Sequence, residues 1–366
     1  MKYSLLMASA LSLLLLGCTN TNESSSQKPA SAITTAAASE QATNTFTGKN
    51  LRLIGRFDQS TTGQAKFTWP GSAVEFQFEG TSAKIAIASQ NPVRFELKLD
   101  GKTQNLWTQS GTHTYTLANN LVKAKHLVRL TRVNESTAGI TSFVSDPQTD
   151  GKLFAVTAPQ KRLLVIGDSI TAGYGVEGAD QTCHYTLDTS NQQLTYAALA
   201  ANSLGADLHA IAWSGIGAWR SYGEKTPVQQ TILDRYPRTL ADDPTSRWEP
   251  SQYTPDAILI NIGTNDYWEE SAPDNYRTAL IKLITHVQND YAGKPVYLIV
   301  SPMLSSKVRE AQKQVLNTMV KDKVKVIDLG EGAGVEGFGC DYHPNSKTHA
   351  RLGKALENTL KTELNW

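Results

Sequence analysis

The spacing of apolar residues changes abruptly near residue 160, and this change constrains the fold more than any other feature of the chain. Before it, apolar and polar residues alternate in runs that contain Val74, Phe76 and Phe78; Ala83, Ile85 and Ile87; and Phe95, Leu97 and Leu99. Successive side chains of a strand point to opposite faces, and Asp100-Gly101 is a hairpin-turn signal. We therefore expect an antiparallel, jelly-roll-like β-sandwich over residues 46–155.

After residue 160, short apolar runs alternate with longer helical patterns, which is typical of parallel βαβ units. Helices with a stripe of apolar residues are expected at 275–291, followed by Gly293 as a stop signal, and at 346–364. This pattern predicts an α/β/α domain with a parallel sheet over residues 160–366. The strands are expected at residues 163–166, 207–212, 257–262, 296–300 and 324–327.

Composition agrees with two globular domains. The chain has 366 residues, of which 40% are hydrophobic and 19% charged, so it can bury sizeable cores. Its formal net charge is only +1, and it has no stripe of Lys and Arg that would follow a phosphate backbone. We expect no nucleic-acid partner.

The first 45 residues are expected to form a lipoprotein signal peptide and a flexible tether. Lys2 and the apolar run 5–16 are typical of a signal peptide, and Leu15-Leu16-Gly17-Cys18 matches a bacterial lipobox, in which the cysteine is lipidated. Residues 19–45 are rich in Ser, Thr and Ala, a composition that favours a flexible tether. The sequence thus predicts a cell-envelope lipoprotein, held at the outer membrane by its lipid anchor if the source is Gram-negative.

Two further cysteines, Cys183 and Cys340, remain once Cys18 is lipidated. An exported pair in an oxidising compartment is a candidate disulfide, which here would join the segment after Ser169 to the segment before Asp341. Two separate buried thiols are the alternative. A metal site is disfavoured because no Cys-x-x-Cys or His-x-x-x-His spacing accompanies them.

Polar clusters follow three of the expected parallel strands. They are Gly-Asp-Ser at 167–169, Trp-Ser-Gly at 213–215 and Gly-Thr-Asn-Asp at 263–266. Ligands of open parallel sheets bind beyond the carboxyl ends of the strands, so the three clusters should meet at one edge.

Ser169 is the candidate nucleophile and His343 the candidate base, because a serine hydroxyl attacks an acyl group only when a base takes its proton. Pro344 favours an extended conformation at His343, which would place the Asp341 carboxylate on the same side as the imidazole. We therefore expect Asp341 to orient the base. The alternative is that Asp341 only caps a turn, which would leave a catalytic dyad.

An acyl transfer also needs donors for the oxyanion. The backbone N–H groups of Ser169 and Gly215 and the side-chain amide of Asn265 are the candidates. Asn265 taken alone would more readily be interpreted as a turn residue, and the neighbouring clusters favour catalysis instead. Asp168 and Asp266 are expected to support the loops that carry Ser169 and Asn265.

These motifs resemble those of the SGNH (GDSL-type) hydrolases. The resemblance rests on Gly167-Asp168-Ser169-Ile170-Thr171, Gly215, Gly263-Thr264-Asn265-Asp266 and Asp341-x-His343-Pro344. Behind an all-β half, the strings 173–178, 214–217 and 339–345 are similar to those of carbohydrate esterase family two. That resemblance implies a jelly roll joined to an SGNH domain, and removal of acetyl groups from xylan or glucomannan. Some family members work as a dyad, but the presence of Asp341 implies a full triad.

The substrate is less clearly indicated than the chemistry. Aromatic residues in the edge loops could stack on sugar rings, and we expect Trp268, Trp219 and Tyr267 to do so, although they could instead pack the domains together. An esterase for lipid, thioester or peptidoglycan O-acetyl substrates is one alternative, and a non-catalytic glycan-binding lipoprotein is another. We expect a monomer with no cofactor and no metal.

Overall fold

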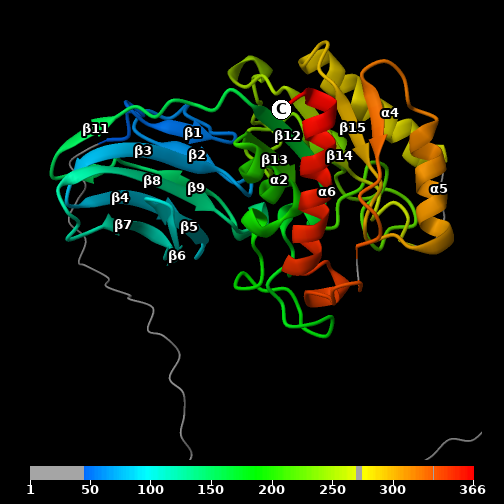
Figure 1. Ribbon diagram of the computed structural model, residues 1–366, viewed down its shortest axis with the longest axis horizontal. Helices are drawn as coiled ribbons and strands as arrows, with labels where there is room; N and C mark the ends of the chain where they lie inside the picture. The colour runs from blue at the N-terminus through cyan, green and yellow to red at the C-terminus, as the bar shows by residue number, and fades with distance from the viewer. Residues whose placement is uncertain (1–44, 269–273, 333) are drawn as a thin grey trace, which may run out of the picture. The chain divides into compact units, whose positions relative to one another are not determined.

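The computed structural model describes residues 45–268, 274–332 and 334–366. Its N-terminal part is the expected antiparallel β-sandwich, drawn in blue to green in Figure 1. One sheet has the order β1-β3-β8-β5-β6, with β11 also paired to β3. Its strands are β1 (Arg52–Ile54), β3 (Ala73–Gly80), β5 (Arg94–Leu99), β6 (Lys102–Trp107), β8 (Ala124–Arg132) and β11 (Lys152–Phe154).

The second sheet of the sandwich has the order β10-β4-β9-β2, with β7 on the other edge of β4. Its strands are β2 (Ala65–Phe67), β4 (Ala83–Ser89), β7 (Gly111–Ala118), β9 (Thr141–Phe143) and β10 (Gln148–Thr149). The inward residues of both sheets form one apolar core rich in phenylalanine. The β5–β6 hairpin turns at Asp100 and Gly101, which both have positive φ, so the predicted turn is confirmed.

The C-terminal part is built on a five-stranded parallel sheet of order β13-β12-β14-β15-β16. All five predicted strands are present within one or two residues of their expected ends, as β12 (Arg162–Gly167), β13 (Asp207–Ala212), β14 (Ala257–Asn261), β15 (Val296–Ile299) and β16 (Val324–Ile327). Both predicted helices are also confirmed. They are α4 (Asp274–Asp290) and α6 (Ser346–Leu364). The other α-helices among the described residues are α1 (Ser169–Ala172), α2 (Tyr196–Leu204), α3 (Ile232–Arg235) and α5 (Ser306–Asn317).

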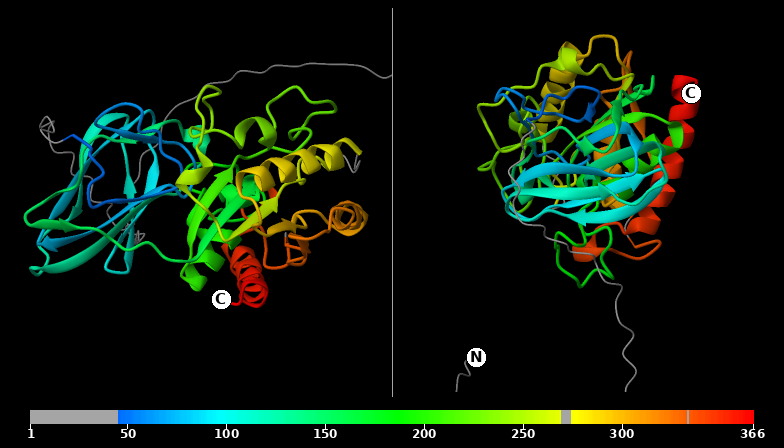
Figure 2. Two further views of the ribbon diagram at one scale, coloured as in Figure 1. Left: turned by 90° about the horizontal axis from the view of Figure 1, so that it is seen from above. Right: turned by 90° about the vertical axis from the view of Figure 1, so that its left-hand side faces the viewer.

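Helices cover both faces of this sheet. Leu164 and Ile166 of β12 point to a core shared with α4, whereas Leu163 and Val165 point to a core shared with α2 and α6. The left panel of Figure 2 shows the sheet between α4 and α6. Because the β12 side chains of residues 163–166 are buried on one face or the other, these residues form an unbroken apolar run, as in buried parallel strands.

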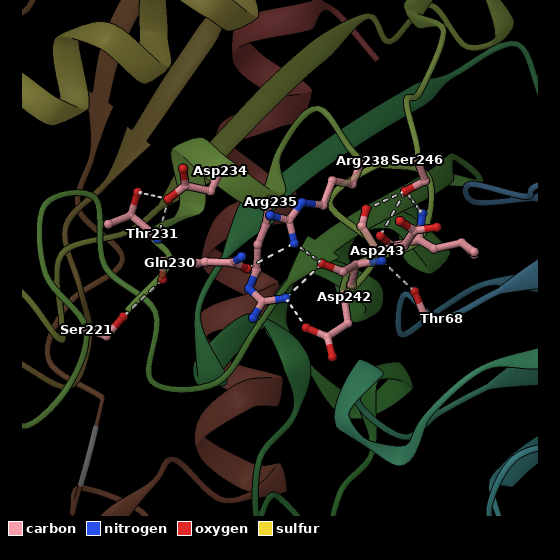
Figure 3. Close-up of polar contacts among 12 residues, drawn as sticks. Thr68, Ser221, Gln230, Thr231, Asp234, Arg235, Arg238, Asp242, Asp243 and Ser246 are labelled. Atoms are coloured by element: carbon pink, nitrogen blue, oxygen red, sulfur yellow. Dashed lines mark hydrogen bonds and ion pairs between the residues drawn. The ribbon is translucent and has the colours of Figure 1, made fainter. Parts of the chain in front are cut away.

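The segment between β13 and β14 is a long connection held by polar contacts (Figure 3). The Arg235 and Arg238 guanidinium groups both donate to the backbone oxygen of Ala241, at 2.8 and 3.0 Å. The backbone N–H of Ala241 in turn donates to Thr68 Oγ1 of the sandwich at 2.8 Å. These contacts join the connection to the β-sandwich and fix a segment that begins at the predicted site.

The predicted signal peptide, the predicted lipidation site Cys18 and most of the predicted tether lie outside the described residues. Among the helices that are described, none is long and apolar enough to cross a membrane.

Candidate active site

Ser169 lies where the sequence predicts, directly beyond the carboxyl end of β12. It is the first residue of α1, and the Asp168 side chain caps this helix by accepting the backbone N–H of Ile170 at 3.0 Å. The cap fixes the turn that carries the serine, which confirms the supporting role expected of Asp168. Ser169 is 5% exposed, so its hydroxyl lies at the bottom of a hollow and not on an open surface.

His343 reaches Ser169 from the other end of the chain. The distance between its Nε2 and Ser169 Oγ is 2.8 Å, and its Nδ1 lies 3.0 Å from the backbone oxygen of Asp341. A carbonyl oxygen can only accept, so Nδ1 carries the hydrogen and Nε2 is free to accept the serine proton. The pairing of Ser169 with His343 follows the sequence prediction.

The predicted contact between the Asp341 carboxylate and the imidazole is wrong. His343 is extended, with φ −77° and ψ 157°, as Pro344 requires. Asp341 and Tyr342, however, both have positive φ, at 51° and 61°. The rule that alternate residues share a face holds only along an extended segment, and this left-handed pair turns the carboxylate away. The aspartate backbone, and not its side chain, orients the base.

The Asp341 carboxylate instead binds a neighbouring loop. It accepts hydrogen bonds from Tyr174 Oη at 2.8 Å, His184 Nδ1 at 2.9 Å and the backbone N–H of Tyr185 at 3.0 Å. Burial opposes ionisation of this carboxyl, but these hydrogen bonds outweigh burial and hold its pKa below the usual range. The ring of Tyr174 stacks on His343 with centroids 4.2 Å apart. The Asp341 carboxylate therefore acts on the base indirectly, through Tyr174, whereas the Asp341 backbone carbonyl contacts the imidazole directly.

A disulfide between Cys183 and Cys340 fastens the same loop to the histidine segment. The backbone N–H of Asp341 also donates to the Cys183 oxygen at 3.0 Å. Gly178 makes room for the bridge, since a Cβ there would lie 2.4 Å from Cys340 Sγ. The bridge joins the loop after Ser169 to the segment just before His343, as the positions of the cysteines suggested.

The residues of the three predicted oxyanion donors, Ser169, Gly215 and Asn265, line one cleft. Gly215 has a φ of +78°, which only glycine adopts without strain, and its backbone lines the same cleft as Ser169. The Asn265 amide donates one hydrogen to the Ile216 oxygen at 2.7 Å, which leaves its second hydrogen available. The Ser169 N–H is the first of its helix and therefore has no acceptor within that helix.

Asp266 organises the loop after Gly215. Its carboxylate accepts the backbone N–H groups of Ala218, Trp219 and Arg220, at 2.9, 2.8 and 3.1 Å. Its role is structural, but its carboxylate supports the loop after β13, whereas support was expected for the loops that carry Ser169 and Asn265.

Burial shapes the acid–base properties of the site. Desolvation lowers the pKa of His343, and the hydrogen bond to the Asp341 oxygen only partly opposes it. A lowered pKa keeps the imidazole neutral at neutral pH, which is the form that accepts a proton. The geometry and the protonation state therefore agree with a general base.

The cleft over these residues has a volume of about 750 Å³. Trp268 and Tyr267 line it, but Trp219 does not. Trp219 packs against the core of the catalytic domain and against the Arg220 guanidinium, so its predicted place in the sugar site is wrong. Tyr267 is only 1% exposed, which limits it to the cleft wall, whereas Trp268 lies beside the 65%-exposed Tyr222 with ring centroids 5.5 Å apart.

Sequence reasoning missed several residues of the cleft. The segment after β15 supplies one wall, with Met303, Leu304, Ser305 and Val308. Ligands of parallel sheets bind beyond the carboxyl ends of the strands, and β15 lies next to β14 in the sheet. The segment after β15 could therefore have been predicted from the sequence, as the segments after the other three strands were. Tyr174 and Tyr185 had no such signal, because their partner is the rotated carboxylate of Asp341. In the part of the chain that the structure describes, no three His, Cys, Asp or Glu side chains are grouped to hold a metal ion.

Comparison with known proteins agrees with this architecture. The family model for the N-terminal domain of carbohydrate esterase 2 matches residues 53–156, and that of the GDSL-like lipase/acylhydrolase family matches residues 165–351. A solved family two carbohydrate esterase from Clostridium thermocellum, in complex with cellohexaose, has a TM-score of 0.82 and 32% identity. That match covers 86% of this chain and 99% of the other.

Two characterised relatives extend the comparison. A cellulase/esterase, CelE, of Acetivibrio thermocellus is 33% identical over 323 residues, which are 85% of this chain but 39% of that protein. An acetylxylan esterase/glucomannan deacetylase of Cellvibrio japonicus is 26% identical over 311 residues, 81% of this chain and 85% of that protein. This chain thus spans well under half the length of the first relative.

A serine and a histidine at the carboxyl edge of a five-stranded parallel sheet, in a chain that matches the GDSL-like model, define a carboxylic ester hydrolase of the GDSL class. The sandwich in front of that domain narrows the class further. The chain belongs to family two of the carbohydrate esterases.

Proposed function

We propose that this protein removes O-acetyl groups from plant cell-wall polysaccharides, such as xylan or glucomannan, through an acetyl-enzyme on Ser169. The observation that carries the proposal is the 2.8 Å distance between Ser169 Oγ and His343 Nε2, in a cleft bordered by oxyanion donors. The substrate class is supported by the relative from Cellvibrio japonicus, named as an acetylxylan esterase and glucomannan deacetylase.

In the first half of the reaction, His343 Nε2 takes the Ser169 proton while Oγ bonds to the acetyl carbonyl carbon. The N–H groups of Ser169 and Gly215 and the Asn265 amide stabilise the oxyanion. The tetrahedral intermediate then collapses, the bond to the sugar oxygen breaks, and the imidazolium gives its proton to that oxygen. The Asp341 carbonyl accepts the Nδ1 hydrogen throughout and stabilises the positive charge of the imidazolium.

In the second half, a water molecule repeats the attack on acetyl-Ser169. His343 takes a proton from this water, and the same three donors stabilise the second oxyanion. The intermediate expels Ser169 Oγ, which recovers its proton from the imidazolium, and acetate leaves. Each half needs one neutral imidazole at the start, which the lowered pKa of His343 provides.

The cleft fits a small acyl group on a large alcohol. Its wall residues Met303, Leu304 and Val308 are apolar, while Trp268 and the exposed ring of Tyr222 offer faces on which a pyranose can stack. The exposed Tyr222 ring and the buried Ser169 hydroxyl support a pose with the sugar toward solvent and the ester inside the cleft. This arrangement favours an acetylated polysaccharide over a long acyl chain.

Trapping the acyl-enzyme tests the proposal. Acid quenching during turnover of an aryl acetate, followed by peptide mass spectrometry, should find one acetyl group on the peptide that contains Ser169. An Asn265→Ala variant should turn over more slowly with a trapped fraction close to that of wild type, because the same donors serve the oxyanions of both half-reactions. Acetylation of another residue, or release of acetate with no trapped intermediate in either protein, would contradict the mechanism.

We also propose that the protein is a lipoprotein of the bacterial cell envelope, anchored at the outer membrane through Cys18 after cleavage of residues 1–17. The support is the lipobox Leu15-Leu16-Gly17-Cys18 and the polar tether that follows it. Labelled palmitate should be incorporated into the wild-type protein expressed in a bacterium and not into Cys18→Ala. Equal labelling of both proteins would overturn this proposal.

A further inference from the structure

A carboxylate of the β-sandwich extends into the catalytic domain at the edge of the active site. Glu135 precedes the short helix η1 (Ser136–Ala138) and is 2% exposed. Its Oε1 accepts the Ser214 hydroxyl at 2.6 Å, and its Oε2 accepts the Ser214 backbone N–H at 3.3 Å. One residue of the β13 loop is thus held by both its side chain and its main chain.

Ser214 directly precedes Gly215, a proposed oxyanion donor. The peptide that joins the two carries the Gly215 N–H, so rotation about the Ser214 backbone would change the direction of that donor. Beyond Gly215, the loop is fixed by a hydrogen bond from the Tyr222 N–H to the Gly215 oxygen at 2.8 Å and by the contacts of Asp266. Before Gly215, Glu135 is the side chain that holds it.

Glu135 is itself rigidly placed. The Arg132 guanidinium donates to the backbone oxygens of Asn134 and Glu135, at 3.2 and 2.6 Å. The Asn134 amide in turn donates to the Leu187 oxygen of the catalytic domain at 2.8 Å. The glutamate therefore projects from a segment that is fixed to both domains.

Burial disfavours the ionised form of the Glu135 side chain. Burial raises the pKa of Glu135 to about 7, and the two hydrogen bonds from Ser214 only partly oppose this. The ionisable groups that face it are the phenols of Tyr174 and Tyr185, while Arg132 contacts its backbone. A buried carboxylate without an ion-pair partner lowers the stability of the folded protein, and a destabilising residue beside an active site points to a role in catalysis.

We propose that Glu135 is a positioning residue that keeps the Gly215 N–H directed at the oxyanion, so that the β-sandwich forms part of the catalytic apparatus. The inference rests on the proposed acyl transfer and deepens it. Since Glu135 acts on the oxyanion donor and not on sugar binding, its loss should reduce kcat and leave KM nearly unchanged.

The test compares Glu135→Ala, Glu135→Gln and Ser214→Ala on a small aryl acetate. Removal of a whole oxyanion donor costs about 10² to 10³ in rate, so misplacing one should lower kcat by roughly 10- to 100-fold in Glu135→Ala. Glu135→Gln keeps one acceptor for Ser214 and should recover most of the loss. The double variant Glu135→Ala/Ser214→Ala should have a kcat no lower than that of the less active single variant, because the two residues act together.

Thr68→Val is the matched control, since it removes another hydrogen bond between sandwich and catalytic domain, the one to Ala241. It should lower stability without changing kcat. The inference is overturned if Glu135→Ala and Thr68→Val have the same kcat, or if the losses of Glu135→Ala and Ser214→Ala multiply. If Glu135→Ala does not fold, Ser214→Ala decides: its kcat should be lower than that of Thr68→Val, and an equal kcat of these two variants would overturn the inference. Full activity of Ser169→Ala would instead refute the proposed function itself.

Discussion

The Nδ1 of His343 lies 3.0 Å from the backbone carbonyl oxygen of Asp341, while the carboxylate of the same aspartate is bound elsewhere, by Tyr174, His184 and the Tyr185 N–H. The aspartate is thus next to the base without forming the usual acid–base pair of a triad. Its carboxylate stabilises the loop that packs against the imidazole.

Asp341→Asn should therefore be a mild variant. The amide oxygen still accepts hydrogen bonds, and the backbone carbonyl that orients His343 is unchanged, so we expect kcat within about tenfold of wild type. Replacing the acid of a true triad by its amide costs about 10⁴ in kcat. Steady-state kinetics on an aryl acetate measure the difference, with His343→Ala as the reference for loss of the base. A 10⁴-fold loss in Asp341→Asn would show that the carboxylate itself orients the imidazole.

The disulfide between Cys183 and Cys340 should support both stability and activity. It joins residues 157 positions apart, and cross-links of this kind typically contribute roughly 2–5 kcal/mol. Reduction should lower Tm by several degrees, at about 2–4 °C for each kcal/mol. It should also lower kcat, because the bridge fixes the segment that carries His343. Calorimetry and kinetics with and without reductant test this.

The double variant Cys183→Ser/Cys340→Ser is the control for that experiment. It should match the reduced wild type and show no response to reductant. An unchanged Tm and kcat on reduction would mean that the loop is held adequately by the Asp341 contacts alone.

Stability should depend on pH through Glu135. The pKa of an unfolded glutamate is about 4.3, and burial raises the folded value to about 7. A raised pKa contributes stability that is complete below the unfolded pKa and is lost as the pH rises through 7. Glu135→Gln does not titrate, so it should become more stable than wild type by roughly 1–3 kcal/mol between pH 5 and pH 8.

Denaturant unfolding at several pH values measures this gain, and Glu310→Gln reports the effect of removing one exposed charge. A difference between Glu135→Gln and wild type that stays constant from pH 5 to pH 8 would contradict the prediction. A gain in stability together with a lower kcat would show that the carboxylate serves catalysis at the expense of folding.

Trp268→Ala should impair polysaccharide substrates more than small ones. Its indole N–H donates to the Glu224 oxygen at 3.2 Å, which holds the ring at the cleft beside Tyr222. Loss of a stacking platform should raise KM for acetylated oligosaccharides by roughly 2- to 10-fold, at about 0.5–1.5 kcal/mol per aromatic contact, and leave aryl acetates nearly unchanged. Trp219→Phe, outside the cleft, is the matched control. Equal effects on KM for both substrates would contradict a contact between Trp268 and the sugar.

The sequence predicted the elements that depend on local patterns. Alternating apolar residues located β3, β4 and β5, and continuous apolar runs located the parallel strands, because each pattern follows from which faces a strand buries. Ser169, Gly215 and Asn265 could be placed at one edge for the same reason: the ends of parallel strands meet regardless of what lies between them.

The rest depended on backbone turns and on contacts between distant segments. The residue types Asp341 and Tyr342 do not predict two consecutive residues with left-handed backbone conformation. The predicted triad was therefore wrong, because the Asp341 side chain points away from the imidazole. Trp219 was expected in the sugar site from its position in the chain, but the contacts of Asp266 turn its loop inward. Glu135 could not be found, because no motif or strand end marks it and its contact with Ser214 depends on how the two domains pack.

Acetate release by wild type and by Ser169→Ala, measured on acetylated xylan and acetylated glucomannan, tests the central claim most directly. Wild type should release acetate from at least one of the two, and Ser169→Ala should be slower by a factor of about 10³ or more while retaining the wild-type fold. Equal rates of release by the two proteins would contradict the account, since the hydroxyl held 2.8 Å from His343 would then have no part in the reaction.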